Sequence, residues 1–319
     1  KRYLRLEHGT PSHDTFGRLF RLLDAKVFEA CFREWISDLA GVVAGVVAID
    51  GKTACGSRDG HNTALHTVSA YATASGLCLG QEHTRGKGHE IPAIKALLDT
   101  LALKGCIVTI DAIGCQTEIA RKILDRGGDY LLAVKDNQKD LADALREFFA
   151  DGEPRGFGSL PVSRFQSLEK AHGRIETRQA MWVTNLSWLD KKLREHWPKL
   201  AGLGMIERQR EINGAVSTER AYYIGSQGIK SAESFAKAAR DHWGIENSLH
   251  WVLDITFRED DCRVRKDHAP HNFAALRKFA LALLRKDTQF PKRSLRSRRK
   301  TAERLPDYRA SLLGLSSPS

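Results

Sequence analysis

The chain has 319 residues, and 50 Lys and Arg against 39 Asp and Glu give it a formal net charge of +11. With 42% hydrophobic and 28% charged residues, the composition is that of a folded globular protein and excludes a disordered or fibrous chain. A basic balance favours polyanionic partners, nucleic acid before anionic lipid. The longest apolar run, 41–49, is far shorter than the roughly 20 residues of a membrane span, and no signal peptide is expected.

The positive charge is concentrated near the carboxyl end. Between residues 285 and 304, nine basic side chains stand against two acidic ones, a local charge of +7. We expect residues 286–319 to form a basic C-terminal tail. Composition leaves open whether this tail is merely solvated or clamps phosphates.

The six cysteines contain no C-x-x-C pair, and most stand in apolar runs. This pattern predicts buried free thiols in a reducing compartment, and neither a disulfide framework nor a zinc site.

The first 150 residues change from helical to strand periodicity. Two amphipathic helices over 12–40, with Ser12 and Asp24 as N-caps, predict a small helical module at 1–41. A strand at 46–49, ended by Asp50-Gly51, begins the next region, 42–150. There follow a hairpin of 66–72 and 77–83, a helix at 90–103, a strand at 106–110, a helix at 117–126, a strand at 130–134 and a helix at 141–149. This order predicts a mixed α/β sheet like the ribonuclease H-like core.

The next region, 151–228, is expected to be a β-rich insertion. Short strands are predicted at 179–184, 204–210 and 220–224, and Asn213-Gly214 is a strong hairpin signal. Helical periodicity returns over 231–253 and again over 272–284, so 229–285 is expected to complete the core. Trp243 and Trp251 are predicted to pack in that core rather than to stack on bases.

Three acids stand out because of their positions. Asp50 and Asp111 end the first and fourth predicted strands, which are neighbours in a ribonuclease H-like sheet. Two adjacent carboxylates repel each other, and a divalent cation removes that penalty. Glu246, on a predicted helix, would complete a site for two metal ions about 4 Å apart. Asp254 and the acids at 259–261 are alternatives, and an Asp before Gly is also a common turn former.

Five blocks of sequence carry a resemblance to a known family. They are Ala48-Ile49-Asp50-Gly51-Lys52-Thr53, residues 105–112, Gly114-Cys115-Gln116, residues 172–178 and residues 242–254. Together they resemble the ISAs-type insertion-sequence transposases, also called H-repeat-associated proteins, over about residues 9–285. That group is similar to the DDE transposases, in which a ribonuclease H-like core cuts and joins DNA strands at element ends.

The resemblance implies that Asp50, Asp111 and Glu246 are both the catalytic residues and the ligands of two Mg²⁺ ions, with Mn²⁺ as a substitute. It also implies DNA as the partner, at terminal inverted repeats and target sites, a homodimer on paired ends, no membrane, and a cytoplasmic, nucleoid-associated place in a prokaryotic cell. Three positions near Glu246 differ from the broader insertion-sequence signature: Ala239 replaces Tyr, His242 replaces Arg and Leu253 replaces Lys. Cys55 and Asp136 stand where the family has Arg and Gly.

Further residues are expected to contact DNA, each with a structural alternative. We expect these contacts from Lys52, Lys135, Asn137, Gln138, His172, Arg174, Arg178, His242 and Asn247. For Lys52 the alternative is a surface lysine on a turn, for 135–138 a polar loop, and for 172–178 a solvated strand face. Two other functions stay open: a metal-dependent nuclease that joins no strands, and a DNA-binding descendant that has lost catalysis.

Overall fold

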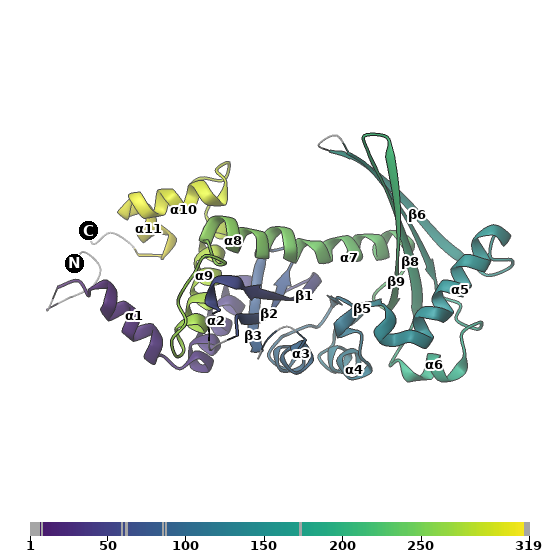
Figure 1. The fold of residues 1–319 in the computed structure, drawn as a ribbon, viewed down its shortest axis with the longest axis horizontal. Coiled ribbons are helices and arrows are strands. Elements are labelled where there is room, and N and C mark those ends of the chain that lie inside the picture. Colours follow the sequence, from purple (N-terminus) through teal and green to yellow (C-terminus); the bar gives the residue numbers. More distant parts are fainter. Residues whose placement is uncertain are drawn as a thin grey trace.

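Nine strands form one mixed β-sheet with the order β3-β2-β1-β4-β5-β9-β8-β7-β6. This is a computed structural model, and it describes residues 7, 9–58, 60, 63–84, 86, 88–171 and 174–315. Across these residues, no helix combines the length and the apolar character needed to cross a membrane. The molecule is elongated, with helices α1 (His13–Leu22) and α11 (Pro306–Leu312) on the side away from the long strands β6–β9 (Figure 1).

Two helices begin the described chain, α1 (His13–Leu22) and α2 (Ala25–Ala40). Both expected caps are confirmed: Ser12 accepts a hydrogen bond from the Thr15 amide, and Asp24 accepts from the amides of Lys26 and Val27. Helix α2 buries Phe32 and Ile36 against Leu77 and Ala282. This apolar contact fixes α2 beside the edge of the sheet.

The first half of the sheet follows the predicted order. It consists of β1 (Gly45–Ala54), β2 (Leu65–Ala72), β3 (Leu77–Thr84), α3 (Glu90–Asp99), β4 (Cys106–Ile110), α4 (Thr117–Asp125) and β5 (Asp129–Val134), with 3₁₀ turns η1 (Cys55–Ser57), η2 (Ala112–Gly114) and η3 (Asp136–Gln138). The expected β2–β3 hairpin is confirmed. Strands β1 and β4 are parallel neighbours, also as predicted.

One boundary prediction is wrong: β1 does not end at Asp50-Gly51. It continues to Ala54, paired with β2 from Val47↔Ala72 to Ala54↔Leu65. Gly51 is not a turn residue. A Cβ atom there would stand 2.6 Å from Nε2 of His66 and 2.9 Å from Oε1 of Glu90, so the glycine lets these two side chains approach the strand.

The second half of the sheet joins the first without a break. It contains α5 (Lys139–Arg155), β6 (Val162–Ala171), β7 (Arg174–Val183), α6 (Lys191–His196), β8 (Gly202–Ile212) and β9 (Ala215–Gly225). Asn213 and Gly214 both have positive φ, 51° and 81°, as a type I′ hairpin requires. Strand β9 pairs with β5, so the β-rich region extends the core sheet.

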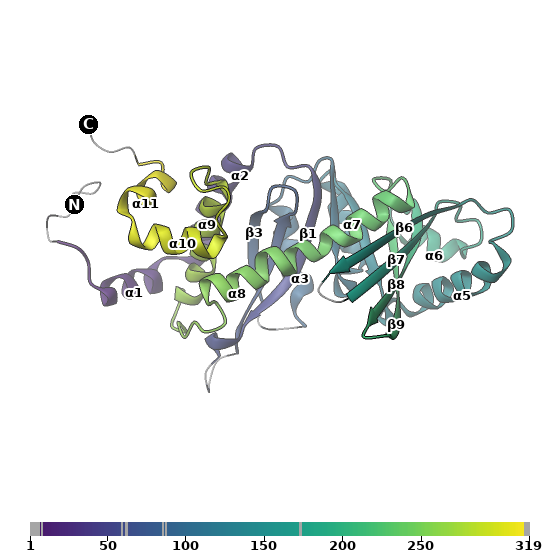
Figure 2. The same cartoon turned by 90° about the horizontal axis from the view of Figure 1, so that it is seen from above.

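The last part of the chain is helical. It comprises α7 (Ala232–Gly244), a π-helical segment η4 (Ile245–His250), α8 (Trp251–Phe257), α9 (Ala269–Lys286), α10 (Leu295–Arg304) and α11 (Pro306–Leu312). Helices α7 and α8 run across one face of the sheet, and α3 and α4 lie on the other (Figures 1 and 2). The sheet is thus the middle of three layers.

Strand alternation decides which side chains meet α7. Val47 and Ile49 belong to the core cluster on the α3 side, whereas Val46 packs with residues of α7 and Ala48 with residues of η4 and α8. Because successive side chains of a strand point to opposite faces, Asp50 shares the face of Ala48. The carboxylate therefore points toward the α7–η4 layer.

Three further expectations are wrong in detail. The segment at 286–319 is not only a solvated tail, because it contains α10 and α11, and Arg298 is buried. Cys31 and Cys55 are exposed, although all six cysteines are free as predicted. Trp243 and Trp251 are 49% and 59% exposed. The apolar side chains that face the core from η4 and α8 are instead those of Ile245, Leu249 and Val252.

Candidate active site

The three acids singled out in the sequence line one cavity of about 510 Å³. Asp50 comes from β1, Asp111 directly follows β4, and Glu246 comes from η4. The register pairs Ile49 with Ile110, so Asp50 and Asp111 occupy the next equivalent positions on two adjacent parallel strands. The sheet therefore places two carboxylates side by side beneath the helix that carries the third.

Asp50 and Glu246 interact directly. Burial, with the nearby Glu246 and Asp111 carboxylates, raises the pKa of Asp50 to about 8. The His250 imidazole, together with a hydrogen bond from Asp50, lowers the pKa of Glu246 to about 2. In the absence of a cation, one proton on Asp50 relieves the repulsion between the two acids.

His250 is a site residue that the sequence analysis missed. Its Nδ1 atom lies 3.6 Å from Oδ2 of Asp50 and 3.9 Å from Oε2 of Glu246. Asp50, Glu246 and His250 offer ligand atoms that all lie within 4.8 Å of one another. The available signal was its position four residues after Glu246, which puts both side chains on one helix face.

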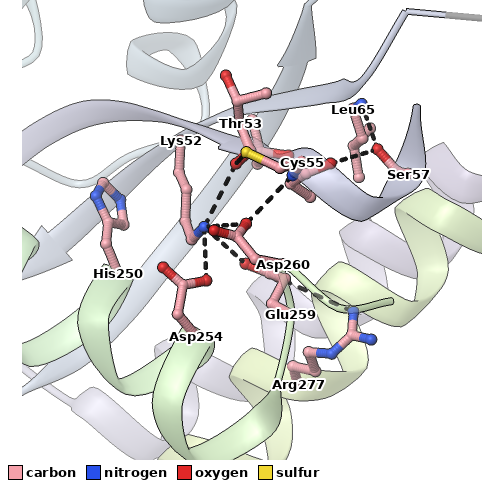
Figure 3. Close-up of polar contacts among 12 residues, drawn as sticks. Lys52, Thr53, Cys55, Ser57, Leu65, His250, Asp254, Glu259, Asp260 and Arg277 are labelled. Atoms are coloured by element: carbon pink, nitrogen blue, oxygen red, sulfur yellow. Dashed lines mark hydrogen bonds and ion pairs between the residues drawn. The ribbon is translucent and has the colours of Figure 1, made fainter. Parts of the chain in front are cut away.

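Lys52 belongs to the interior of the site. Its ammonium lies 2.8 Å from Asp254, 3.0 Å from Asp260 and 4.0 Å from Glu259, and only 11% of its side chain is exposed (Figure 3). These acids are the alternatives named in the sequence analysis. The Lys52 ammonium is therefore paired with carboxylates and does not lie on an open surface that could bind phosphate.

Asn137 and Gln138 support the loop that carries Asp111. The Asn137 amide donates to the Ala112 carbonyl at 2.7 Å, and the Gln138 amide donates to the Cys115 carbonyl at 2.9 Å. Both bonds tie η3 to η2, the turn that begins after Asp111. Lys135, just before them, is exposed.

His242 packs against β4. Its Nδ1 atom lies 3.0 Å from Oγ1 of Thr109, and burial lowers its pKa despite the neighbouring Asp111 and Glu246 carboxylates. Because Thr109 and Asp111 share a strand face, this contact holds α7 against the strand that carries the second acid. His242 therefore lies inside the site beside the acids.

Arg178 and Asn247 line a second cavity, a groove of about 740 Å³ between β6–β9 and α7. Arg178 pairs with Glu176 and, at 3.3 Å, with Glu169. Arg208 and Arg210 also approach Glu176, at 3.7 and 3.3 Å. Acidic side chains therefore neutralise much of the positive charge in this groove.

Two predicted DNA-binding residues cannot be placed in full. His172 lies outside the described residues. For Arg174 only the backbone is described, as the first residue of β7.

Comparison with known proteins decides the family. The model of the family described as "Transposase DDE domain" matches residues 15–283. The chain belongs to the DDE transposase family. Relatives of this DDE transposase include "Putative transposase YncI" of Escherichia coli O157:H7, 40% identical over 89% of the chain and 73% of the relative.

A second relative extends the match over nearly the whole transposase chain. "H repeat-associated putative transposase YhhI" of Escherichia coli K12 is 38% identical over 98% of the chain and 83% of the relative. The expected H-repeat-associated family is thereby confirmed. Among solved structures, a piggyBac transposase synaptic complex with hairpin DNA matches with 12% identity and a TM-score of 0.41, over 97% of this chain and 60% of that one.

Proposed function

We propose that this protein cuts DNA strands at the ends of an insertion sequence and joins them to target DNA, with Asp50, Asp111 and Glu246 as its catalytic acids. The observation that carries the proposal is the cavity in which these acids meet, one on each of two adjacent parallel strands and one on the helix above them. The strands from β3 to β5, with α7 and η4, would form its ribonuclease H-like core.

The donor set fits divalent cations. Three carboxylates supply the oxygen ligands that Mg²⁺ and Mn²⁺ prefer. The Glu246 and Asp111 carboxylates lie near Asp50 and help to raise its pKa, so a cation here would relieve repulsion. When bound, two such ions activate the attacking hydroxyl and stabilise the leaving oxygen of a phosphodiester. We propose Mg²⁺ as the physiological ion, held by Asp50, Asp111 and Glu246.

The chain's own residues would position the DNA strand. Arg178 and Asn247, in the groove between β6–β9 and α7, and the exposed Lys135 would contact the DNA. Lys52, Asn137, Gln138 and His242 would hold the acids in place. A site of this kind works mainly by orientation and charge neutralisation, because phosphoryl transfer needs little covalent help from the protein. The assembly that pairs two DNA ends is proposed to be a homodimer.

The test is cleavage of the DNA that flanks the coding region, with Mg²⁺ or Mn²⁺, by the native chain, by Asp111→Asn and by Asp125→Asn. Asp125 is an exposed acid at the end of α4 and serves as the matched control. We expect cleavage and joined products from the native chain and the control. Asp111→Asn should bind the DNA without cutting it.

Other outcomes separate the remaining functions. Cleavage without joined products would favour a nuclease. DNA binding without cleavage by any of the three proteins would favour a descendant that has lost catalysis. Cleavage by Asp111→Asn at the native rate would remove Asp111 from the mechanism.

A further inference from the structure

We propose that His250 is a protein ligand of the cation held by Asp50 and Glu246, and that its imidazole biases this position toward Mn²⁺ over Mg²⁺. The inference rests on the proposed function, because it concerns the same cavity. It adds a nitrogen donor to a site that the sequence predicted to consist of oxygens alone.

The first argument is that His250 is buried with one ring nitrogen unpartnered and the other facing two carboxylates. The residue is 6% exposed. Its Nε2 atom has no hydrogen-bond partner among the described residues. Its Nδ1 atom is 3.6 and 3.9 Å from the two carboxylates, beyond hydrogen-bond distance. Nδ1 therefore faces both carboxylates across distances that a cation between the three groups would bridge.

The second argument is the spacing of the donors. Nitrogen and oxygen ligands stand about 2.1 Å from a small divalent cation, so two ligands of one ion are at most about 4.2 Å apart. Both distances from Nδ1 lie under this limit. The third separation, between the Asp50 and Glu246 oxygens, is no more than 4.8 Å, so a small movement of the half-exposed Glu246 side chain completes the set.

The third argument is the backbone that presents these donors. Ile245–His250 is a π-helical segment between two α-helices. Such segments are rare and frequently occur at functional sites. A π-turn contains more residues than an α-turn, so residues four apart come closer to the same face. Here those residues are Glu246 and His250, and both face Asp50 on β1.

The donor type predicts the metal preference. Carboxylates suit Mg²⁺ and Mn²⁺ alike, but imidazole nitrogen is a poor ligand for Mg²⁺ and a good one for later divalent metals. An Asp, Glu and His set should therefore hold Mn²⁺ more tightly than Mg²⁺. Mg²⁺ remains able to occupy the oxygen ligands that Asp111 and Glu246 supply.

The test uses Mn²⁺ alone on the full chain, followed by electron paramagnetic resonance. The signal of free Mn²⁺ measures the affinity of the protein for Mn²⁺, and its change on adding Mg²⁺ measures the preference between the two ions. Pulsed spectra of bound Mn²⁺ detect a directly bonded nitrogen. We expect a nitrogen signal that changes when the protein is labelled with ¹⁵N-histidine. His250→Gln should lose this signal and bind Mn²⁺ about tenfold or more weakly. His196→Gln, at the exposed end of α6, should keep the signal.

A second variant covers the case in which His250→Gln does not fold. His250→Asp replaces the nitrogen donor by oxygen, so it should bind both ions, show no nitrogen signal and prefer Mn²⁺ less than the native chain does. Bound Mn²⁺ without a histidine signal in the native protein would overturn the inference and leave the proposed function standing. A histidine signal that persists in His250→Gln would also overturn it. Failure of the native chain to bind either ion would reject both the inference and the metal-dependent function.

Discussion

The ammonium of Lys52 lies 2.8 Å from the carboxylate of Asp254, and this ion pair joins strand β1 to helix α8. Both residues line the cavity that contains the three acids. Asp260 and Glu259 complete the charge around the same ammonium (Figure 3). One lysine thus balances acids from a helix and from the loop after it.

We expect Lys52→Met to lower the free energy of unfolding by about 2–4 kcal/mol, because removing one member of a buried ion pair leaves uncompensated charge. Urea unfolding measures this loss. Lys139→Met, which breaks an exposed pair with Asp143, should cost under about 1 kcal/mol. The double variant Lys52→Met with Asp254→Asn should regain part of the loss. Weaker DNA binding with unchanged stability would instead support the phosphate contact predicted from the sequence.

Asn137 and Lys135 should separate positioning from DNA contact. Asn137→Ala removes the bond to the Ala112 carbonyl and loosens the loop after Asp111. We expect it to slow cleavage about tenfold or more while DNA affinity stays within about twofold, since small misplacement of a catalytic group is costly.

Lys135→Ala should weaken DNA binding. It should also lower the slope of log affinity against log salt concentration by about one, because one phosphate contact is lost. The reverse pattern in binding and cleavage assays would contradict both assignments.

Glu29 should make stability depend on pH. Its carboxylate on α2 accepts a hydrogen bond from the backbone N–H of Gln81 at 3.1 Å, and burial raises its pKa to about 7 in spite of the nearby Lys278 and Arg33. A raised pKa means that the folded state favours the neutral acid. The contribution of neutral Glu29 to the free energy of unfolding is therefore fully present below pH 4.5, and it is lost as pH rises through about 7.

The matched variant is Glu29→Gln, which keeps the shape and cannot ionise. Between pH 4.5 and 8 the native chain should lose up to about 3 kcal/mol of unfolding free energy relative to this variant. Urea unfolding at a series of pH values measures the difference. Parallel pH profiles for the two proteins would show that Glu29 does not titrate in this range.

Arg298 should hold the C-terminal helices to the core. Its guanidinium donates to the carbonyls of Leu284 at 2.8 Å, Pro291 at 2.9 Å and Arg293 at 3.0 Å. We expect Arg298→Ala to expose the segment after α9 to trypsin at least about tenfold faster, because three buried or partly buried carbonyls lose their donor. Arg296→Ala, on an exposed position of α10, should keep the native rate. Equal rates would mean that other contacts hold α10 in place.

Local sequence determined much of the fold because its signals act over short distances. Ser12 and Asp24 are predictable caps, since each side chain bonds to amides two or three residues away. Asn213-Gly214 specifies its hairpin because both residues tolerate positive φ. The order of elements also predicts that β1 and β4 are neighbours, with Asp50 and Asp111 side by side.

Tertiary structure alone decided which distant groups meet. Strand periodicity shows which face is buried but not which strand is the partner, so the pairing of β9 with β5 could not be predicted. The acids around Lys52 and the position of His250 against Asp50 depend on how α7, η4 and α8 cross the sheet. Burial of Arg298 and exposure of Trp251 reverse the usual behaviour of these residue types, because a few tertiary contacts outweigh intrinsic hydropathy.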